Sequence, residues 1–594
     1  MHTVTEWSTS ARGRRCSLLQ ASAWIGLCLG VCLIGATPCN AATSDPWWKH
    51  AVIYEIYPRS FQDSNGDGIG DLNGITQRLD YLESLGVDAI WIAPMYPSPQ
   101  VDFGYDISDY QSVDPQYGTL ADFDRLLAEA GRHHIRVLLD MVLNHTSDKH
   151  PWFIAASASR TDPKHDWYCW SDGRIAPGGQ HAPPNNWVSL FGGSAWQYVP
   201  AVSQFYYHKF YRQQPDLNWR NPAVEAAMFG AMRFWLDRGV AGFRLDAITT
   251  LFEDAQLRDE PVLGGTNSQG DPNLKNIYTD NLPEVHGVIR RMRAMADSYP
   301  GERVLVGETY LARTADIAPW YGGARHDELQ LPMDTLFGLG SKLDAGVFRR
   351  RLLEADTELG GGQPLFVFDN HDNVRSIDRY GDGVHNIEIA RILAALLLTS
   401  RSAALLYQGE EIGQTTATPT RVEDVRDPIG ITGWPKEKGR DGERTPMQWS
   451  ADAQAGFSTN AHTWLPVTAN YRLVNVKTEL AEPKSLLNWY RRLIELRRTS
   501  AALRDGRTLM LDRDNAAVLT YLRVADDGAA VFVALNMSPR SQQIAPRLAQ
   551  AGVKGARLET LLSSPVPLGA VAPGETVTLT PYAAWVATVT GGPH

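Results

Sequence analysis

The stretch Gly242-Phe243-Arg244-Leu245-Asp246-Ala247 is a short apolar run that carries two charged residues. If the run is extended, Arg244 and Asp246 stand two residues apart and point to the same side of a strand. A guanidinium beside a carboxylate at a strand end can keep that carboxylate ionised and oriented as a nucleophile. The stretch alone is equally consistent with a buried strand that ends in a structural ion pair, so the surrounding chain has to decide.

Short apolar runs alternate with longer amphipathic segments through most of the chain. Strands are predicted at 51–57, 89–93, 137–142, 241–245, 304–306, 365–368 and 403–407, with a further one near 328–333. Helices are predicted at 74–85, 120–132, 223–236, 282–298, 387–399 and 486–498. Repeated strand–helix units form parallel sheets, and eight such units close a barrel. The predicted fold class is therefore α/β, a (β/α)8 TIM barrel.

Two regions depart from this alternation. Residues 145–215 are rich in Pro, Gly, Trp and Ser with little periodicity, which predicts an irregular subdomain inserted after the third strand. Residues 506–594 contain short alternating runs without helices between them, which predicts a C-terminal antiparallel β-sandwich. The barrel is then expected to comprise residues 43–144 and 216–505.

The N-terminus has the layout of a secretory signal. Arg12, Arg14 and Arg15 precede an apolar run at 21–36, and small residues follow at 41–42. The run is short for a membrane-spanning helix, which needs about 20 residues, and an uncleaved anchor is the alternative. Residues 1–42 are therefore predicted to be a cleaved signal peptide of a periplasmic or secreted protein, without membrane contact after cleavage. The net charge of −11 argues against a nucleic-acid partner.

Polar side chains stand where several predicted strands end. They are Asp140, Asn144 and His145 at the end of the third strand, Arg244 and Asp246 at the end of the fourth, Glu308 at the end of the fifth, and Asn370, His371 and Asp372 at the end of the seventh. Strand ends of a barrel meet on one face, so three carboxylates (Asp246, Glu308 and Asp372) are expected in one pocket. Such a set suits glycoside hydrolysis, in which one carboxylate attacks the anomeric carbon and a carboxylic acid protonates the leaving oxygen. A metal centre is the competing interpretation, and it is weakened because the histidines are not four residues apart.

A different metal site is predicted in the loop Asp63-Ser64-Asn65-Gly66-Asp67-Gly68-Ile69-Gly70-Asp71. Oxygen donors alternate with glycines that allow a tight wrap, and donors without His or Cys favour Ca²⁺. The loop begins like an EF-hand, but its twelfth position is Gly74 rather than Glu, so it is not that motif. A solvated turn is the alternative. Because the loop is far in sequence from the carboxylates, the ion is expected to be structural.

With these motifs, the chain resembles the α-amylase family of glycoside hydrolases (family 13), in its oligo-1,6-glucosidase and α-glucosidase branch. The resemblance runs from Trp47-Trp48 to Arg444-Thr445-Pro446-Met447-Gln448-Trp449, and Gln214-Pro215-Asp216-Leu217-Asn218 is similar to a signature of that branch. It implies that Asp246 is the nucleophile, Glu308 the general acid/base, and Asp372 the carboxylate that clasps and distorts the −1 sugar.

The same resemblance implies a set of binding residues. His145 and His371 would hold sugar hydroxyls, Arg244 would orient the nucleophile, and Asp102 and Tyr105 would cap the non-reducing end. Arg444 would be the partner of Asp102, with Arg440 as its competitor. Phe191, Phe210 and Gln214 would line the pocket. The Ca²⁺ ligands would be Asp63, Asn65, Asp67, the Ile69 carbonyl and Asp71, and no organic cofactor is implied.

The implied activity is that of a retaining, exo-acting α-glucosidase that releases glucose from short α-glucosides such as maltose and malto-oligosaccharides, with sucrose as a further candidate. Ala247 favours α-1,4 bonds, since similar α-1,6 enzymes tend to carry Val there. Glu308-Thr309-Tyr310 and Thr249-Thr250 depart from the family pattern and leave the +1 site open. The alternatives are an oligo-1,6-glucosidase, a transglucosylase or isomerase such as a trehalose synthase or sucrose-acting enzyme, and a non-enzymatic, membrane-anchored relative, which the three carboxylates disfavour.

Overall fold

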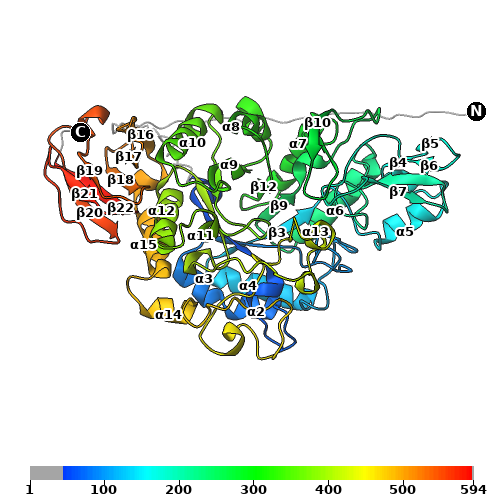
Figure 1. The fold of residues 1–594 in the computed structure, drawn as a ribbon, viewed down its shortest axis with the longest axis horizontal. Coiled ribbons are helices and arrows are strands. Elements are labelled where there is room, and N and C mark those ends of the chain that lie inside the picture. The colour runs from blue at the N-terminus through cyan, green and yellow to red at the C-terminus, as the bar shows by residue number, and fades with distance from the viewer. Residues whose placement is uncertain (1–44, 592–594) are drawn as a thin grey trace, which may run out of the picture. The chain divides into compact units, whose positions relative to one another are not determined.

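The computed structural model describes residues 45–591 (Figure 1). The predicted signal peptide, residues 1–42, lies outside the described residues. Within the described part of the chain, no helix has the length and apolar character needed to cross a bilayer.

Eight parallel strands close into a barrel in the order β1-β15-β14-β13-β12-β9-β3-β2. They are β1 (Val52–Ile56), β2 (Ala89–Ile92), β3 (Arg136–Val142), β9 (Gly242–Asp246), β12 (Val304–Gly307), β13 (Leu331–Asp334), β14 (Leu365–Val367) and β15 (Ala403–Tyr407). The predicted (β/α)8 barrel is confirmed, and the strand expected near residues 328–333 is β13.

Helices surround the barrel and bury their apolar faces against the strands. The long ones are α4 (Leu120–Arg132), α6 (Pro222–Leu236), α7 (Val285–Asp297), α10 (Ala345–Glu358), α12 (Asn386–Thr399) and α15 (Leu486–Thr499). The helix expected at 74–85 is two helices, α2 (Leu72–Gln77) and α3 (Leu79–Leu85). Shorter helices are α1 (Pro58–Phe61), α8 (Thr314–Ile317), α9 (Thr335–Gly338), α11 (Ser376–Arg379), α13 (Pro428–Gly433), α14 (Val476–Ala481) and α16 (Ala501–Arg504).

The region between β3 and α6 contains more regular structure than its sequence indicates. It holds α5 (Pro151–Ala158), β4 (Trp170–Ser171), β5 (Arg174–Ile175), β6 (His181–Ala182), β7 (Trp196–Val199) and β8 (Gln204–Tyr207). These strands form a three-stranded sheet, β4-β8-β7, and the pair β5-β6. Buried aromatic residues, among them Trp187, Trp196 and Tyr207, give this region a small core of its own. A hairpin of β10 (Val262–Thr266) and β11 (Pro272–Leu274) lies in the loop after β9.

The C-terminal region is an antiparallel β structure, as predicted. Five strands pair in the order β16-β17-β18-β22-β20, and β19 pairs with β21 in a second sheet. Their bounds are β16 (Arg507–Leu511), β17 (Val518–Val524), β18 (Ala530–Asn536), β19 (Gln542–Ile544), β20 (Arg557–Ser564), β21 (Val577–Leu579) and β22 (Ala584–Thr590). One buried apolar cluster contains residues of both sheets, including Phe532, Ile544, Leu579 and Trp585.

Alternate residues of each barrel strand point into the barrel. A layer of apolar side chains there is followed, towards the carboxyl ends of the strands, by a layer of polar side chains. The interior apolar cluster includes Ile53 of β1, Leu138 of β3 and Val306 of β12. Two residues further along come Glu55 and Asp140 on the same strands and Glu308 directly after β12, so these residues face the same interior. Parallel pairing sets Arg244 of β9 beside Asp140, so that the charged residues lie at one level. The functional site is thus built where the barrel strands end.

Candidate active site

Arg244 connects the acidic residues at the strand ends. Its Nη1 donates to Asp246 Oδ1 at 2.5 Å and to both carboxylate oxygens of Asp140 at 3.1 Å. Its Nη2 donates to Glu308 Oε1. Because the Arg244 side chain is fully buried, these contacts keep it in one orientation. The structure therefore brings the predicted nucleophile and the predicted acid/base onto a single guanidinium.

Glu308 occupies an environment that favours its protonated form. Burial, together with the nearby carboxylates of Asp246 and Asp372, raises the pKa of Glu308 to about 7, while Arg244 opposes the shift. Its second oxygen accepts a hydrogen bond of 2.8 Å from the Ala247 backbone N–H. Burial also raises the pKa of Asp246, and Arg244 again opposes it.

Asp372 has the opposite electrostatic environment. Burial alone would raise the pKa of Asp372, but the guanidinium groups of Arg440 and Arg444 outweigh burial and hold it well below its usual range. Arg440 Nη1 and Arg444 Nη2 both donate to Asp372 Oδ1, at 2.9 and 2.8 Å. Asp372 is therefore a permanent anion beside the Asp246–Glu308 pair.

His371 is held from both sides of its ring. It is stacked on Tyr57 and Tyr105, with ring centroids 5.4 and 5.3 Å apart. Its Nδ1 lies 2.5 Å from Glu55 Oε1, and its Nε2 lies 2.8 Å from the Tyr105 hydroxyl. Burial lowers the pKa of His371 well below its usual range, so the ring is neutral. Glu55 was not among the residues identified from sequence, because a glutamate inside a strand carries no local signal of its partner.

One side of the site is closed by an ion pair that corrects one sequence-based expectation. Arg440 Nη2, not Arg444, donates to Asp102 Oδ1, at 2.8 Å. Gln214 Nε2 donates to the other Asp102 oxygen at 3.0 Å. Arg440 also binds Asp427 at 2.8 Å, whereas Arg444 lies deeper and donates to the His371 carbonyl at 2.9 Å. The two arginines are four residues apart in a loop without regular structure, so the sequence could not tell which one reaches Asp102.

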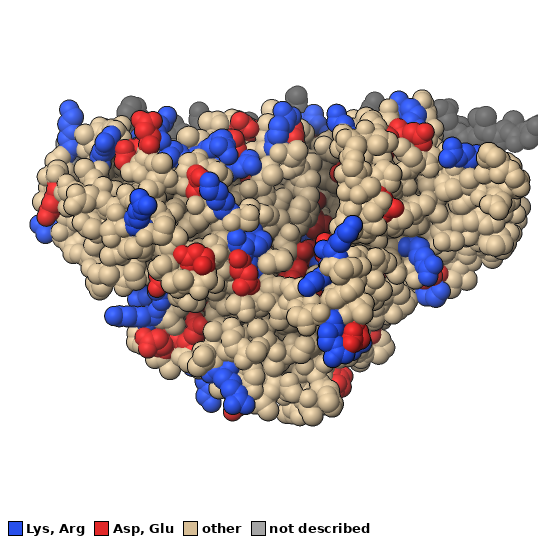
Figure 2. Space-filling view, in the orientation of Figure 1, with Lys and Arg blue, Asp and Glu red and all other residues tan. Residues whose placement is uncertain are grey.

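These residues surround a cavity of about 460 Å³. Ten residues predicted from the sequence line it: Asp102, Tyr105, His145, Phe191, Phe210, Gln214, Asp246, Glu308, His371 and Asp372. Arg244 and Arg444 do not line the cavity and are fully buried behind it. His145 Nε2–H donates to the Tyr105 carbonyl, 3.1 Å away, and burial lowers the pKa of His145 to about 3. Figure 2 shows acidic side chains gathered in a hollow of the visible face.

Several cavity residues carried no signal in the sequence. They are Leu190, Lys209, Asn276, Asp280, Asn373 and Ile429. Most belong to the inserted region or to the long loops after β9 and β15, where neither hydrophobic periodicity nor a motif points to a role. Only the tertiary fold brings them to the carboxylates.

The loop 63–71 carries the donor types expected for Ca²⁺. The Asp63 side chain accepts from the backbone N–H groups of Asn65, Gly66 and Gly68, at 2.7–3.0 Å, so the loop curls around this carboxylate. Asp71 accepts from Ser64 and caps α2 by accepting from the Gly74 N–H. The oxygen-only donor set of the predicted ligands suits a hard cation.

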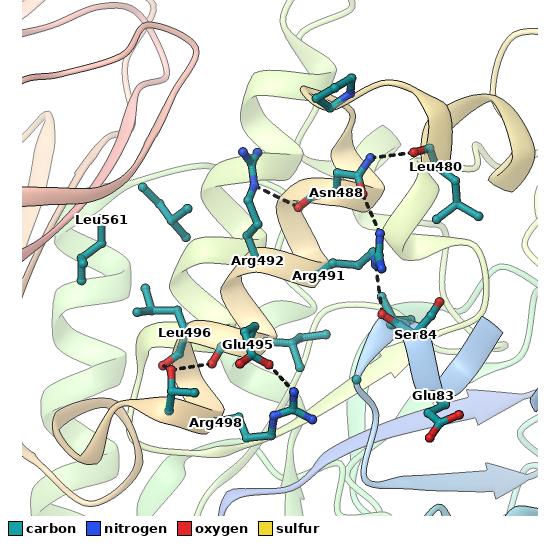
Figure 3. A pocket seen from close by; sticks show the side chains of 16 residues that line it. Glu83, Ser84, Leu480, Asn488, Arg491, Arg492, Glu495, Leu496, Arg498 and Leu561 are labelled. Atoms are coloured by element: carbon teal, nitrogen blue, oxygen red, sulfur yellow. Dashed lines mark hydrogen bonds and ion pairs between the residues drawn. The ribbon is translucent and has the colours of Figure 1, made fainter. Parts of the chain in front are cut away.

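A larger groove lies elsewhere and has no catalytic character. It has a volume of about 880 Å³ and is lined by residues of α3, α15 and β20 (Figure 3). Arg491 donates to the Ser84 carbonyl at 2.9 Å, and Arg498 is paired with Glu495. The larger volume therefore does not mark the active site, which is the smaller cavity with the convergent carboxylates.

Comparison with known proteins agrees with this geometry. Residues 55–506 match the family model described as "Alpha amylase, catalytic domain". A protein of Rhizobium meliloti (strain 1021) named "Probable alpha-glucosidase" is 43% identical over 505 residues, which cover 83% of this chain and 89% of that protein. An "Oligo-1,6-glucosidase" of Parageobacillus thermoglucosidasius is 38% identical over 522 residues, covering 82% and 90%. The crystal structure of an α-glucosyl transfer enzyme, XgtA, superposes with a TM-score of 0.82 at 40% identity, covering 92% of this chain and all of that one.

Three findings lead to one assignment: the barrel, the carboxylates bound to one guanidinium, and these matches. The chain is a glycoside hydrolase and belongs to the α-amylase family, in its α-glucosidase and oligo-1,6-glucosidase branch.

Proposed function

We propose that this enzyme is a retaining, exo-acting α-glucosidase that releases glucose from the non-reducing end of short α-1,4-glucosides. The observation that carries the proposal is that Asp246 and Glu308 both accept hydrogen bonds from Arg244. Two carboxyl groups on one guanidinium must be near each other. Retaining enzymes hold their two carboxyl groups about 5–5.5 Å apart, whereas inverting enzymes hold them about 6.5–9.5 Å apart to leave room for a water. Two carboxyl groups on one guanidinium suit the shorter separation better.

In the proposed mechanism, Asp246 attacks the anomeric carbon while Glu308 gives its proton to the departing glycosidic oxygen. The raised pKa of Glu308, about 7, supports the acid role at neutral pH. The resulting glucosyl ester on Asp246 is then attacked by a water, whose proton returns to Glu308. Asp372 remains ionised throughout, where it can clasp the sugar hydroxyls and stabilise positive charge on the oxocarbenium-like ring.

Exo-action is supported by the pairing of Asp102 with Arg440. This pair is buried and is anchored by Gln214 and Asp427, so the cavity is closed on the side of the non-reducing end. A closed end accepts one glucose unit and leaves no path for a polymer to pass through. Tyr105 and Phe210 provide flat surfaces beside this position, as expected for a sugar ring.

The preference for α-1,4 bonds is supported by Ala247, which lines the cavity directly after the nucleophile. Transglucosylation is the second candidate, favoured by the similarity to the α-glucosyl transfer enzyme. It uses the same covalent intermediate and differs only in whether a sugar or a water attacks it.

Two further proposals concern the whole protein. We propose that Ca²⁺ binds the loop 63–71 through Asp63, Asn65, Asp67, the Ile69 carbonyl and Asp71, and that it stabilises the loop without entering the reaction. We also propose that the protein is exported to the periplasm or the medium, on the basis of the predicted signal peptide.

Product analysis tests the proposed activity. The purified enzyme is incubated separately with maltose, isomaltose and sucrose, each at low and high concentration, and the products are separated by chromatography. We expect glucose as the main product from maltose, at a higher kcat/KM than from isomaltose. Trehalose, or longer glucosides as the main products even at low maltose concentration, would overturn hydrolysis in favour of transfer.

A further inference from the structure

Lys209 and Asp280 form one polar wall of the cavity. The proposed catalytic residues do not use this wall. Both side chains line the same cavity as Asp246 and Glu308. Neither takes part in the contacts of Arg244 or in the Asp102–Arg440 pair. Lys209 comes from the inserted region and Asp280 from the long loop after β9, so only the fold brings them together.

This wall lies on the side of the leaving group. The general acid Glu308 is anchored to the Ala247 N–H, so the departing oxygen must meet its proton beside Ala247. Two residues further along is Thr249, whose carbonyl accepts a hydrogen bond of 2.8 Å from the backbone N–H of Asn281, the neighbour of Asp280. The segment that follows the nucleophile is therefore tied to the segment that carries Asp280.

Lys209 retains hydrogen-bonding capacity. Its side chain is almost completely buried, and its Nζ donates to Thr279 Oγ1 at 3.1 Å. An ammonium group carries three N–H donors, so donors remain for a ligand in the cavity. Burial lowers the pKa of Lys209, and the carboxylates of Asp280, Asp216 and Glu260 act against that shift.

Asp280 supplies the complementary acceptor. Its Oδ1 is buried and has no hydrogen-bond donor among the described residues, while the Thr249 side chain and the Asn281 backbone N–H also interact with this carboxylate. Buried carboxylate oxygens are nearly always partnered in folded proteins, so an unpartnered one on a residue that lines a cavity indicates a missing donor. A hydroxyl group of a bound molecule would supply it.

We infer that Lys209 and Asp280 recognise adjacent hydroxyls of a sugar leaving group, one accepting from the ammonium and the other donating to the carboxylate. This inference rests on the proposed function and names the class of substrate: a neutral disaccharide or oligosaccharide, as opposed to a glucoside with an apolar aglycone. Anionic leaving groups such as phosphorylated sugars are disfavoured, because Asp280, Asp216 and Glu260 outnumber the single ammonium.

The experiment compares two substrates that share the glucosyl half. The variants Lys209→Met and Asp280→Asn are assayed on maltose, whose leaving group carries hydroxyls, and on p-nitrophenyl α-glucoside, whose leaving group carries none. We expect each variant to lose about 10- to 100-fold in kcat/KM on maltose and to stay within about 3-fold of wild type on the nitrophenyl substrate. Lys149→Met, which removes an exposed lysine paired with Asp148, serves as the matched control and should change neither.

Three outcomes would overturn the inference. The first is an unchanged kcat/KM on maltose in both variants, and the second is an equal loss of kcat/KM on both substrates. The third is that the wild-type enzyme prefers a disaccharide that is phosphorylated on its leaving group. If Lys209→Met is not obtained folded, Asp280→Asn alone decides, since Asp280 is only partly buried. If wild type does not cleave maltose, the proposed α-1,4 preference fails separately, and the same comparison is made with whichever of isomaltose or sucrose it cleaves.

Discussion

At Arg244 a single buried cation donates hydrogen bonds to three acids, Asp140, Asp246 and Glu308. Removing charges from water is costly, and one guanidinium cannot fully compensate three carboxylates. The imbalance appears as the raised pKa of Glu308, about 7, which supports the proposed role of this residue as the acid at neutral pH. The same excess of buried negative charge should lower the free energy of unfolding of the wild-type protein when Glu308 is ionised.

The variant Glu308→Gln measures that loss. A glutamate in an unfolded chain has a pKa of about 4.3, so between about pH 4.5 and 7 the folded protein keeps a proton that the unfolded chain has released. The contribution of Glu308 to stability therefore falls as the pH rises through this window. We expect Glu308→Gln to be more stable than wild type by about 1–3 kcal/mol at pH 8, and to differ by less than about 1 kcal/mol at pH 4.5.

Urea unfolding of both proteins at the two pH values provides the measurement. A stability difference that is the same at pH 8 and pH 4.5 would show that Glu308 does not titrate with a raised pKa. Activity gives an independent check, because kcat/KM on maltose should decrease as the pH rises through about 7 and the acid loses its proton.

At the scale of elements, the end of β9 sets the position of both reacting groups. Ala247 follows the strand with φ of 44° and ψ of 35°, a left-handed conformation that is uncommon for a residue with a side chain. This turn directs the Ala247 N–H at Glu308 while Asp246, one residue earlier, remains on the strand. A change of side chain at 247 therefore acts next to both carboxylates.

We expect Ala247→Val to shift the enzyme from α-1,4 towards α-1,6 bonds. The two added methyl groups narrow the cavity beside the scissile bond, where maltose brings its second ring closer than the more flexible isomaltose does. The ratio of kcat/KM for maltose over that for isomaltose should fall about 10-fold or more. Ala247→Ser, nearly the same size as wild type, should leave the ratio within about 2-fold. An unchanged ratio in the valine variant would remove Ala247 as a determinant of linkage.

The elements that were predictable from sequence are those with a strong local pattern. Helix α4 was predicted with its observed bounds, because its apolar residues repeat at helical spacing and Thr119 and Asp122 form a capping box. Helix α10 was not predicted, although Phe348, Leu352 and Ala355 have the right spacing, because a run of arginines interrupts the pattern. That Asp246, Glu308 and Asp372 meet in one cavity was predictable because each follows a predicted strand.

Contacts made by loops could not be derived in the same way. Arg440 and Arg444 stand in a loop that has no repeating geometry, so either could reach Asp102 until the fold was known. Lys209 and Asp280 are some 70 residues apart in two irregular segments, and nothing local relates them. Loop residues of this kind determine which leaving group fits, so substrate specificity was less predictable than the catalytic chemistry.

At the scale of the whole molecule, the C-terminal sheet is joined to the barrel by buried arginines. Arg523 of β17 donates to the Thr399 carbonyl at the end of α12, at 2.8 Å, and to the Gly506 carbonyl at 2.7 Å. Arg349 of α10 donates to the carbonyls of Asn515 and Val518, at 2.8 and 3.0 Å. The contacts of Arg523 with Thr399 and of Arg349 with Asn515 and Val518 connect the two parts, so the sheet acts as a support for the barrel helices.

Replacing Arg523 by Met should therefore reduce stability without altering catalysis. The substitution keeps the volume of the side chain but leaves buried carbonyl oxygens without donors, which costs about 2–4 kcal/mol. Urea unfolding measures the loss, and Arg513→Met, at an exposed position near the same sheet, should lose less than about 0.5 kcal/mol. Because Arg523 does not line the cavity, kcat/KM of the folded protein should stay at the wild-type value. A large fall in kcat/KM would show that the sheet influences the active site.

The most direct test of the account is the configuration of the first product. Asp246 and Glu308 on one guanidinium are proposed to act by double displacement, which retains the configuration at the anomeric carbon. In proton NMR of p-nitrophenyl α-glucoside hydrolysis, we predict that α-glucose appears first and that β-glucose grows in only as fast as mutarotation allows. The appearance of β-glucose as the first product would contradict the assignment of Asp246 as nucleophile.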